Sequence, residues 1–199
     1  MLPGIVLAAG DSVRMGFPKA LLTAADGQAF VARIVGTLRD AGVSDVVVVT
    51  GRDHDAVVEV LRQSGLISVL KVARNPDPSR GQLSSLWVGM DAVVDPATEG
   101  LLVTLVDVPM VARSTVTAVI EAWRRTRAPI VRPAIGSRHG HPVIFDRTLL
   151  DELRQAPIDA GAKSVVRAHE RDILNVAVDD EGCLSDVDTP EDYRMLRGG

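Results

Sequence analysis

Small and cationic residues gather in one stretch near the start of the chain, Leu7–Lys19, which directly follows a short apolar run. Its first residues have small side chains or none, so a polyphosphate can come close to their backbone N–H groups. Arg14 adds a bidentate guanidinium, and Lys19 adds a mobile point charge. The stretch is therefore predicted to bind phosphate groups. The residues predicted to line this loop are Leu7, Ala8, Ala9, Gly10, Arg14 and Lys19.

The glycine spacing distinguishes this loop from the two best-known nucleotide loops. Gly10 and Gly16 are separated by five residues, and Lys19 comes three residues after the second glycine. This pattern fits neither GxxxxGK[ST] nor GxGxxG. A surface turn with two solvated cations is the alternative interpretation of any single part of the stretch. The combination of a strand, small residues and cations in one register favours phosphate binding.

Asp107 follows a mostly apolar run, Leu101–Val106, that predicts a buried strand. Ligands of open α/β sheets bind beyond the carboxyl ends of the strands, so a carboxylate at this position can face a metal. Capping of the next turn is the alternative role for Asp107. A phosphate loop at the end of another strand favours the metal role. Mg²⁺ prefers one or two carboxylates with phosphate oxygens and water, so a second acid is expected.

A second acidic segment lies near the C-terminus and reads Ser185-Asp-Val-Asp-Thr-Pro-Glu-Asp-Tyr. Proline is favoured in the first turn of a helix, so Asp188 or Thr189 can be the N-cap of a helix that begins at Pro190. From the residues alone, capping is the simpler role for Asp188. Asp186 is the runner-up candidate for a metal ligand in this segment.

Two other segments carry polar groups that chemistry could use. An apolar helix is expected to follow Gly81, Ser84 and Ser85 and to reach about Val94. The first N–H groups of this helix would be free to bind an anion, or the serines would cap them. The segment Gly136–Phe145 is predicted to form a hairpin with a basic tip. Its two histidines, at 139 and 141, lack further cysteine or histidine partners, so turn or pocket roles are favoured over zinc binding.

The order of apolar runs and breakers predicts an α/β fold with a mostly parallel sheet. We expect a single-domain, Rossmann-like three-layer sandwich over residues 1–199, with helices on both faces and a small acceptor-side hairpin insertion at about 129–170. The strands are expected at 4–8, 45–50, 67–72, 101–106, 129–134 and 173–178. Helices are expected at about 30–42, 53–61, 81–94, 114–127, 148–154 and 163–169.

Composition excludes several classes of protein. The 199 residues are 46% hydrophobic, enough for one full core, and the net charge is −4 with scattered basic residues. Nucleic acid is therefore not an expected partner, and 3% aromatic content leaves few stacking platforms. Cys183 is the single cysteine, and neither a signal peptide nor a membrane span is recognisable. We expect a cytoplasmic protein without a membrane partner.

The loop string resembles the signature of the nucleotidyltransferases similar to molybdenum cofactor cytidylyltransferase and its guanylyltransferase relative. Loops of that family read LAAG or LAGG, then x-S-x-RMG, then a lysine. The C-terminal Asp-x-Asp-Thr-Pro-Glu-Asp-Tyr string resembles the second signature of the same family. The resemblance covers nearly the whole chain.

The resemblance implies a role for each matching residue. Arg14, Lys19 and Asp107 are expected to be catalytic, and Asp107 and Asp188 to hold Mg²⁺. His141, in Gly140-His-Pro-Val, and Arg138 are expected on the acceptor side, where Arg138 would meet a phosphate. The implied nucleotide-binding residues are Leu7, Ala8, Ala9, Gly10, Arg14, Lys19, Asn75, Gly81 and Ser85.

The implied reaction is transfer of CMP from CTP to a phosphorylated acceptor, the molybdenum-bearing pterin, with release of pyrophosphate. No GxSxG elbow or activated cysteine is recognisable, and a phosphate monoester acceptor is itself a nucleophile because its second pKa is about 6. Ala9 favours CTP, since cytidylyl members carry LAAG. The alternatives are GTP as the donor, a sugar or isoprenoid phosphate as the acceptor, and a non-catalytic carrier that meets a molybdoenzyme or chaperone transiently.

Overall fold

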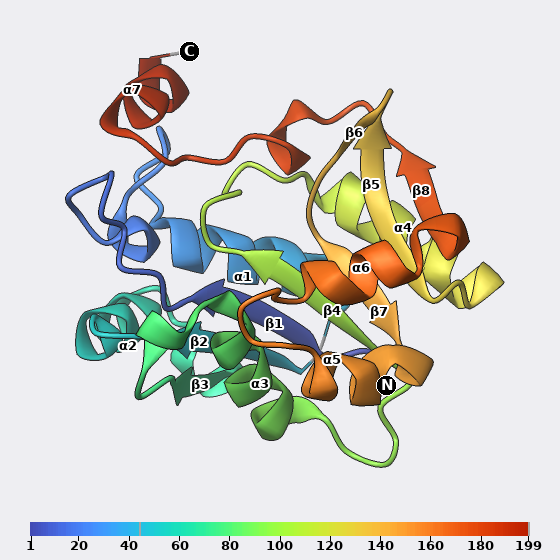
Figure 1. Ribbon diagram of the computed structural model, residues 1–199. Helices are drawn as coiled ribbons and strands as arrows, with labels where there is room; N and C mark the ends of the chain where they lie inside the picture. The colour runs from blue at the N-terminus through green and yellow to red at the C-terminus, as the bar shows by residue number, and fades with distance from the viewer. Residues whose placement is uncertain (44, 199) are drawn as a thin grey trace.

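The computed structural model describes residues 1–43 and 45–198, which form an eight-stranded sheet between two layers of helices (Figure 1). The strands are β1 Gly4–Ala8, β2 Val46–Thr50, β3 Lys71–Arg74, β4 Gly100–Leu105, β5 Ile130–Ile135, β6 Arg138–His139, β7 Val143–Asp146 and β8 Ile173–Ala177. The helices are α1 Phe30–Asp40, α2 His54–Gln63, α3 Gln82–Val93, α4 Arg113–Thr126, α5 Leu150–Gln155, α6 Lys163–Ala168 and α7 Pro190–Gly198.

The sheet is mostly parallel and brings several strand ends to one edge. Its order is β3-β2-β1-β4-β7-β5-β6, and β8 pairs with β5. Strands β1 to β4 run parallel to one another, and β7 is antiparallel to both β4 and β5. Strand β5 therefore runs in the same direction as β1 and β4, and β8 runs parallel to β5. The carboxyl ends of β1, β4, β5 and β8 consequently lie at the same edge, as the predicted Rossmann-like class requires.

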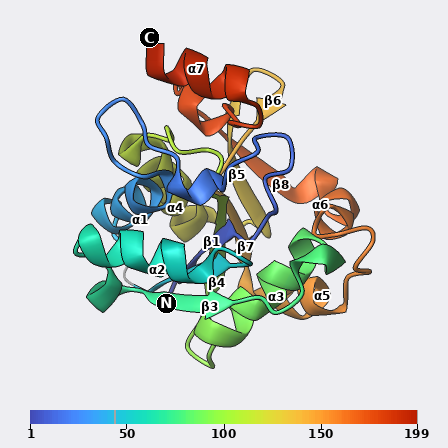
Figure 2. The same ribbon diagram turned by 90° about the vertical axis from the view of Figure 1, so that its left-hand side faces the viewer.

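Helices cover both faces of the sheet, which confirms the three-layer prediction. Buried side chains of α1, α2 and α4 pack on one face, and those of α3, α5 and α6 pack on the other. Figure 2 shows these two groups of helices on opposite sides of the strands. The consecutive valines of β2 are all fully buried because they contribute alternately to both cores.

One predicted strand is displaced along the chain. The apolar run expected as a strand at 67–72 instead forms a 3₁₀ turn, Ile67–Val69, and the strand β3 begins only at Lys71. The reason is that Ile67 and Leu70 pack against the core beneath the turn, while the ladder with β2 starts at the pair Val47–Lys71. The prediction was therefore wrong for residues 67–70 and correct for residues 71 and 72.

The hairpin expected at 136–145 is present, but a bulge interrupts its second arm. β5 pairs with β6 through Ala134–His139 and then with β7 through Val131–Ile144. Between these two pairs, the second arm contains residues 140–143, whereas β5 contains only residues 132 and 133, so the second arm has extra residues. Extra residues of this kind re-aim a side chain. A Cβ on Gly140 would lie 2.1 Å from the carbonyl oxygen of Cys183, so only glycine fits this close approach.

The segment expected as an acceptor-side insertion, about 129–170, contributes β5, β6 and β7 to the main sheet and α5 and α6 to one of its faces. No helix in the described part of the chain has both the length and the apolar character needed to cross a membrane.

Candidate active site

A cavity of about 390 Å³ opens at the carboxyl ends of β1 and β4. Its walls come from the loop after β1, the start of α3, the end of β4 and the segment before α7. Most of the residues that the sequence predicted for the site line this one cavity. They are Leu7, Ala8, Ala9, Gly10, Arg14, Lys19, Gly81, Ser85, Asp107 and Asp188.

The loop after β1 is held by its own hydrogen bonds. The backbone N–H groups of Met15 and Gly16 donate to the carbonyl oxygen of Ser12, each at 3.0 Å. The hydroxyl of Ser12 accepts a bond from the backbone N–H of Lys19 at 3.1 Å. Gly16 has a φ of +71°, in the left-handed region that favours glycine. These contacts bring Lys19 back beside the start of the loop.

The central contact of the cavity is an ion cluster around Lys19. Its ammonium donates to Asp107 Oδ2 at 3.1 Å and also donates to Asp188 Oδ1. Arg14 Nη2 donates to Asp188 Oδ2 at 2.6 Å. The side chain of Lys19 is 13% exposed, whereas that of Arg14 is 70% exposed. One cation therefore lies at the base of the cavity, and the other lies at its mouth.

This arrangement changes the pKa values of the charged groups. Burial lowers the pKa of Lys19, but Asp188 and Asp107 more than offset this effect, so its pKa is raised. The hydrogen bond from Lys19, with the charge of Arg14, lowers the pKa of Asp188. Burial and the charges of Asp107 and Asp188 raise the pKa of Asp186. Asp186 thus lies near both acids.

A helix cap leaves Asp188 free to face Lys19. The hydroxyl of Thr189 accepts the backbone N–H of Asp192 at 3.2 Å, and the carboxylate of Asp192 accepts the backbone N–H groups of Thr189 and Asp188. Thr189 is therefore the N-cap of α7, and Asp188 is not. The backbone N–H of Val187 donates to the carbonyl oxygen of Asp107 at 2.8 Å, which ties this segment to the end of β4.

The carboxylates of Asp107 and Asp188 are a pair in the cavity that could hold a divalent cation. Asp107 Oδ1 is buried and has no hydrogen-bond partner, and both carboxylates face the same ammonium. Carboxylate oxygens beside a phosphate-binding loop suit a hard cation that takes its remaining ligands from phosphate and water. Across residues 1–43 and 45–198, no group of three His, Cys, Asp or Glu side chains is placed to hold a metal ion.

Gly81 and Ser85 line the cavity, whereas Asn75 does not. Asn75 is 4% exposed, and its side-chain amide donates to the hydroxyls of Ser84 and Ser85, each at 2.9 Å. Its side-chain oxygen accepts the backbone N–H of Asp77 at 3.0 Å. Asn75 lines a smaller neighbouring hollow of about 150 Å³. The structure therefore places Asn75 as a support for Ser85 at the start of α3.

The two predicted acceptor-side residues have different surroundings, and neither lines the main cavity. His141 follows Gly140 in the bulge, and its Nδ1 is buried without a partner. Burial lowers the pKa of His141, and the charge of Asp107 and the backbone of Val103 partly oppose this effect, so His141 lies near Asp107. The exposed Arg138 instead donates to Glu181 at 2.6 Å, which neutralises its charge.

Sequence reasoning missed Asp53, Pro78 and Gln82, which also line the cavity. Asp53 is the N-cap residue of α2, but its side chain makes no capping bond. It follows the end of β2, next to the end of β1. The rule that ligands bind beyond strand ends could have identified it.

Comparison with known proteins agrees with this geometry. Residues 4–173 match the MobA-like NTP transferase domain family. The chain is 32% identical to nicotine blue oxidoreductase of Paenarthrobacter nicotinovorans, over 97% of this chain and 95% of that protein. It is 26% identical to a probable molybdenum cofactor guanylyltransferase of Mycobacterium avium, over 98% of this chain and 94% of that protein.

The fold is similar to solved structures across its whole length. Rv0371c of Mycobacterium tuberculosis superposes with a TM-score of 0.84 and 30% identity, covering 100% of this chain and 97% of that one. A manganese complex of Rv0371c superposes with a TM-score of 0.75 and 28% identity, covering 100% and 98%. The family match spans most of the chain and includes the cavity loop and Asp107. The chain therefore belongs to the MobA-like NTP transferase family of nucleotidyltransferases.

Proposed function

We propose that this protein transfers CMP from CTP to a phosphorylated pterin that carries molybdenum, with release of pyrophosphate. The observation that supports this proposal most strongly is the ion cluster in the cavity. Lys19 joins Asp107 and Asp188, which come from distant parts of the chain, directly beside a loop of small residues. A triphosphate in this cavity would meet backbone donors, two cations and two potential metal ligands.

The residues of the chain would act mainly by positioning and by charge. The triphosphate would approach the backbone of Ala8, Ala9 and Gly10, with Ser85 and the start of α3 on the opposite wall. Leu7 lies in the wall formed by the loop after β1, and Gly81 lies in the wall formed by the start of α3. Arg14 and Lys19 would offset the negative charge that builds on phosphate oxygens during in-line displacement. Since the acceptor phosphate is largely dianionic at neutral pH, no protein nucleophile is required.

Asp107 and Asp188 would hold a divalent cation, which we propose to be Mg²⁺. When bound, such an ion polarises phosphoryl oxygens as a Lewis acid. The unpartnered Oδ1 of Asp107 supports this role, as does the manganese complex of the similar protein Rv0371c. His141 and Arg138 are proposed on the acceptor side, because the hairpin that carries both brings His141 close to Asp107.

The base is proposed to be cytosine because Ala9 matches the cytidylyl form of the loop. GTP is the alternative donor, since several similar proteins are named probable molybdenum cofactor guanylyltransferases. A redox reaction is the alternative reaction class, because one similar protein is named nicotine blue oxidoreductase. The grouping of phosphate-binding cations with two carboxylates favours nucleotidyl transfer.

Pyrophosphate release with CTP, Mg²⁺ and the phosphorylated pterin tests the proposal. We expect Asp107→Asn to lower the rate at least about 100-fold, because it removes a charged group that acts on the transition state. Asp91→Asn is the matched control, since Asp91 is an exposed carboxylate paired with Arg154 away from the cavity, and it should leave the rate unchanged. A folded wild-type protein that releases no pyrophosphate with either CTP or GTP would not be a nucleotidyltransferase for this acceptor.

A further inference from the structure

Arg132 of β5 is a partly buried cation without a carboxylate partner. Its Nε donates to the neutral side-chain oxygen of Asn175 on β8 at 2.9 Å, and it forms no ion pair with any described residue. Burial lowers the pKa of Arg132, and the charge of Glu170 opposes this effect only in part. By contrast, Arg138, the arginine that the sequence suggested for the acceptor, is already paired with Glu181.

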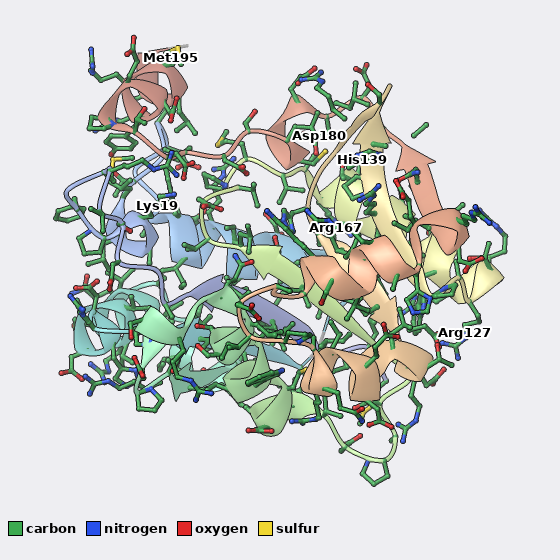
Figure 3. The ribbon with its side chains drawn as sticks, viewed as in Figure 1. Lys19, Arg127, His139, Arg167, Asp180 and Met195 are labelled. Atoms are coloured by element: carbon green, nitrogen blue, oxygen red, sulfur yellow. The ribbon has the colours of Figure 1, made fainter. Side chains whose placement is uncertain are left out.

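Arg132 lies on the sheet face that α6 covers in part. Ile130 belongs to the core cluster beneath α5 and α6, and side chains alternate along a strand, so Arg132 faces the same side. His139, paired with Ala134, lies on this face as well, and the charge of Arg132 helps to lower its pKa. Figure 1 shows α6 crossing one end of β5 while the end near β6 stays uncovered in this view. Figure 3 shows His139 and Arg167 of α6 in this region.

The register places Arg132 within reach of a molecule that occupies the cavity. Val131 pairs with Ile144 of β7, which pairs with Leu102 of β4, and Leu105 at the end of β4 lines the cavity. By this register Arg132 lies level with Val103, two residues before Leu105, so Arg132 and Leu105 are about 10 Å apart across the sheet and about 7 Å apart along it. An extended acceptor whose reacting phosphate is near Asp107 can therefore contact Arg132 with its other end.

We propose that Arg132, flanked by His139, binds an anionic or oxo group at the end of the acceptor remote from the reacting phosphate. An anion there would pair with a partly desolvated guanidinium whose hydrogen-bond partner is neutral and which forms no ion pair with Glu170 or any other described residue, and the guanidinium fork suits two acceptor oxygens. This inference rests on the proposed function and names the part of the acceptor that this chain recognises. It makes Arg132 a specificity-determining residue.

The test compares Arg132→Gln with Arg154→Gln, which removes a charge from an α5 arginine that pairs with Asp91 and does not line the cavity. Glutamine at 132 can still donate to Asn175, so the contact between β5 and β8 is retained. We expect Arg132→Gln to raise the KM for the phosphorylated pterin at least about tenfold, since a charge-assisted bond is lost, while CTP affinity stays unchanged. Calorimetric titration of the pterin without CTP should give the same loss of affinity. Arg154→Gln should alter neither quantity.

Glycerol 3-phosphate, a short phosphate monoester, identifies which end of the acceptor Arg132 contacts. It should react equally slowly with the wild type and Arg132→Gln, because it lacks the remote group. A difference between the two proteins would mean that Arg132 contacts the reacting phosphate instead.

The outcomes with the pterin separate this inference from the proposed function. An active wild type with an unchanged pterin KM in Arg132→Gln would overturn the inference and keep the transferase. A wild type that binds the pterin through Arg132 but releases no pyrophosphate would keep the subsite and reject the transferase. A wild type that neither binds nor reacts would reject both.

Discussion

Lys19 joins two acids that lie 88 and 169 residues away along the chain. Because its ammonium is mostly shielded from water, its attraction to both carboxylates is screened less than that of a surface pair. Lys19 thus holds Asp107 and Asp188 together. The more exposed Arg14 contacts only Asp188 and remains accessible from the mouth of the cavity.

Cys183 yields a prediction about alkaline pH. Its side chain is fully buried, and this burial, with the charge of Asp180, raises its pKa to about 11. A thiol in the unfolded chain titrates near about 8.5, so between these values the unfolded state binds fewer protons than the folded state. The free energy of unfolding should therefore fall as pH rises through this window. We expect a loss of about 1 to 2 kcal/mol by about pH 10.

Urea unfolding of the wild type and Cys183→Ala, at about pH 7 and about pH 10, measures this effect. The variant should start less stable, because it leaves a small void, but its stability should depend less on pH. Equal slopes for the two proteins would mean that the thiol titrates normally in the folded state.

At the scale of single elements, the start of α7 and the bulge between β6 and β7 position the site. The α7 cap uses Thr189 and Asp192, which leaves the carboxylate of Asp188 for Lys19. The bulge places His141 near Asp107, and the backbone N–H of His141 donates to the carbonyl oxygen of Cys183 at 2.9 Å. Both elements are short segments whose hydrogen bonds to backbone groups fix the position of a predicted site residue.

Thr189→Ala tests the link between the α7 cap and the site. Loss of an N-cap costs about 1 kcal/mol, so we expect a drop of that size in the free energy of unfolding. CTP affinity should also fall, because Asp188 directly precedes the cap and would lose its fixed position. The control is Ser185→Ala, which removes an exposed hydroxyl bonded to Glu181 outside the helix. Unfolding titrations measure the stability, and calorimetry measures the CTP affinity. A loss of stability with unchanged CTP affinity would mean that the cap does not position Asp188.

At the scale of the molecule, the sheet gathers the site from both ends of the chain. The loop after β1, the end of β4 and the segment before α7 meet at one edge, and the bond from Val187 to Asp107 closes this arrangement. A ligand that contacts all three segments should stabilise the whole fold, since binding to the folded state alone raises the free energy of unfolding.

Thermal unfolding with CTP and Mg²⁺ measures this linkage. At about 100 times the dissociation constant, CTP should add about 2.7 kcal/mol, which for a chain of this size raises the melting temperature by roughly 5 to 10 °C. Removal of the divalent ion with EDTA should abolish most of the increase, and Asp107→Asn should reduce it. A larger increase with GTP than with CTP would reverse the proposed base preference.

Local patterns in the sequence were sufficient to predict the alternation of strands and helices, the small-residue loop and the position of Asp107, because side-chain size, periodicity and strand ends are local properties. The placement of Asp188 beside Asp107 came from the family resemblance, since the residues alone favoured a capping role. The displaced start of β3 depended on packing of Ile67 and Leu70 against a core that the segment itself does not contain. The supporting role of Asn75 likewise depended on two serines brought beside it by the fold.

The tertiary structure alone decided which charges are compensated. Arg132 and Arg138 are equivalent as residue types in one hairpin, yet Glu181 neutralises one, and only Asn175 meets the other. Similarly, Thr189 rather than Asp188 became the helix cap, since Lys19 and Arg14 occupy the carboxylate of Asp188. The physical reason is that electrostatic partners are chosen by distance in space, which the order of residues along a chain does not contain.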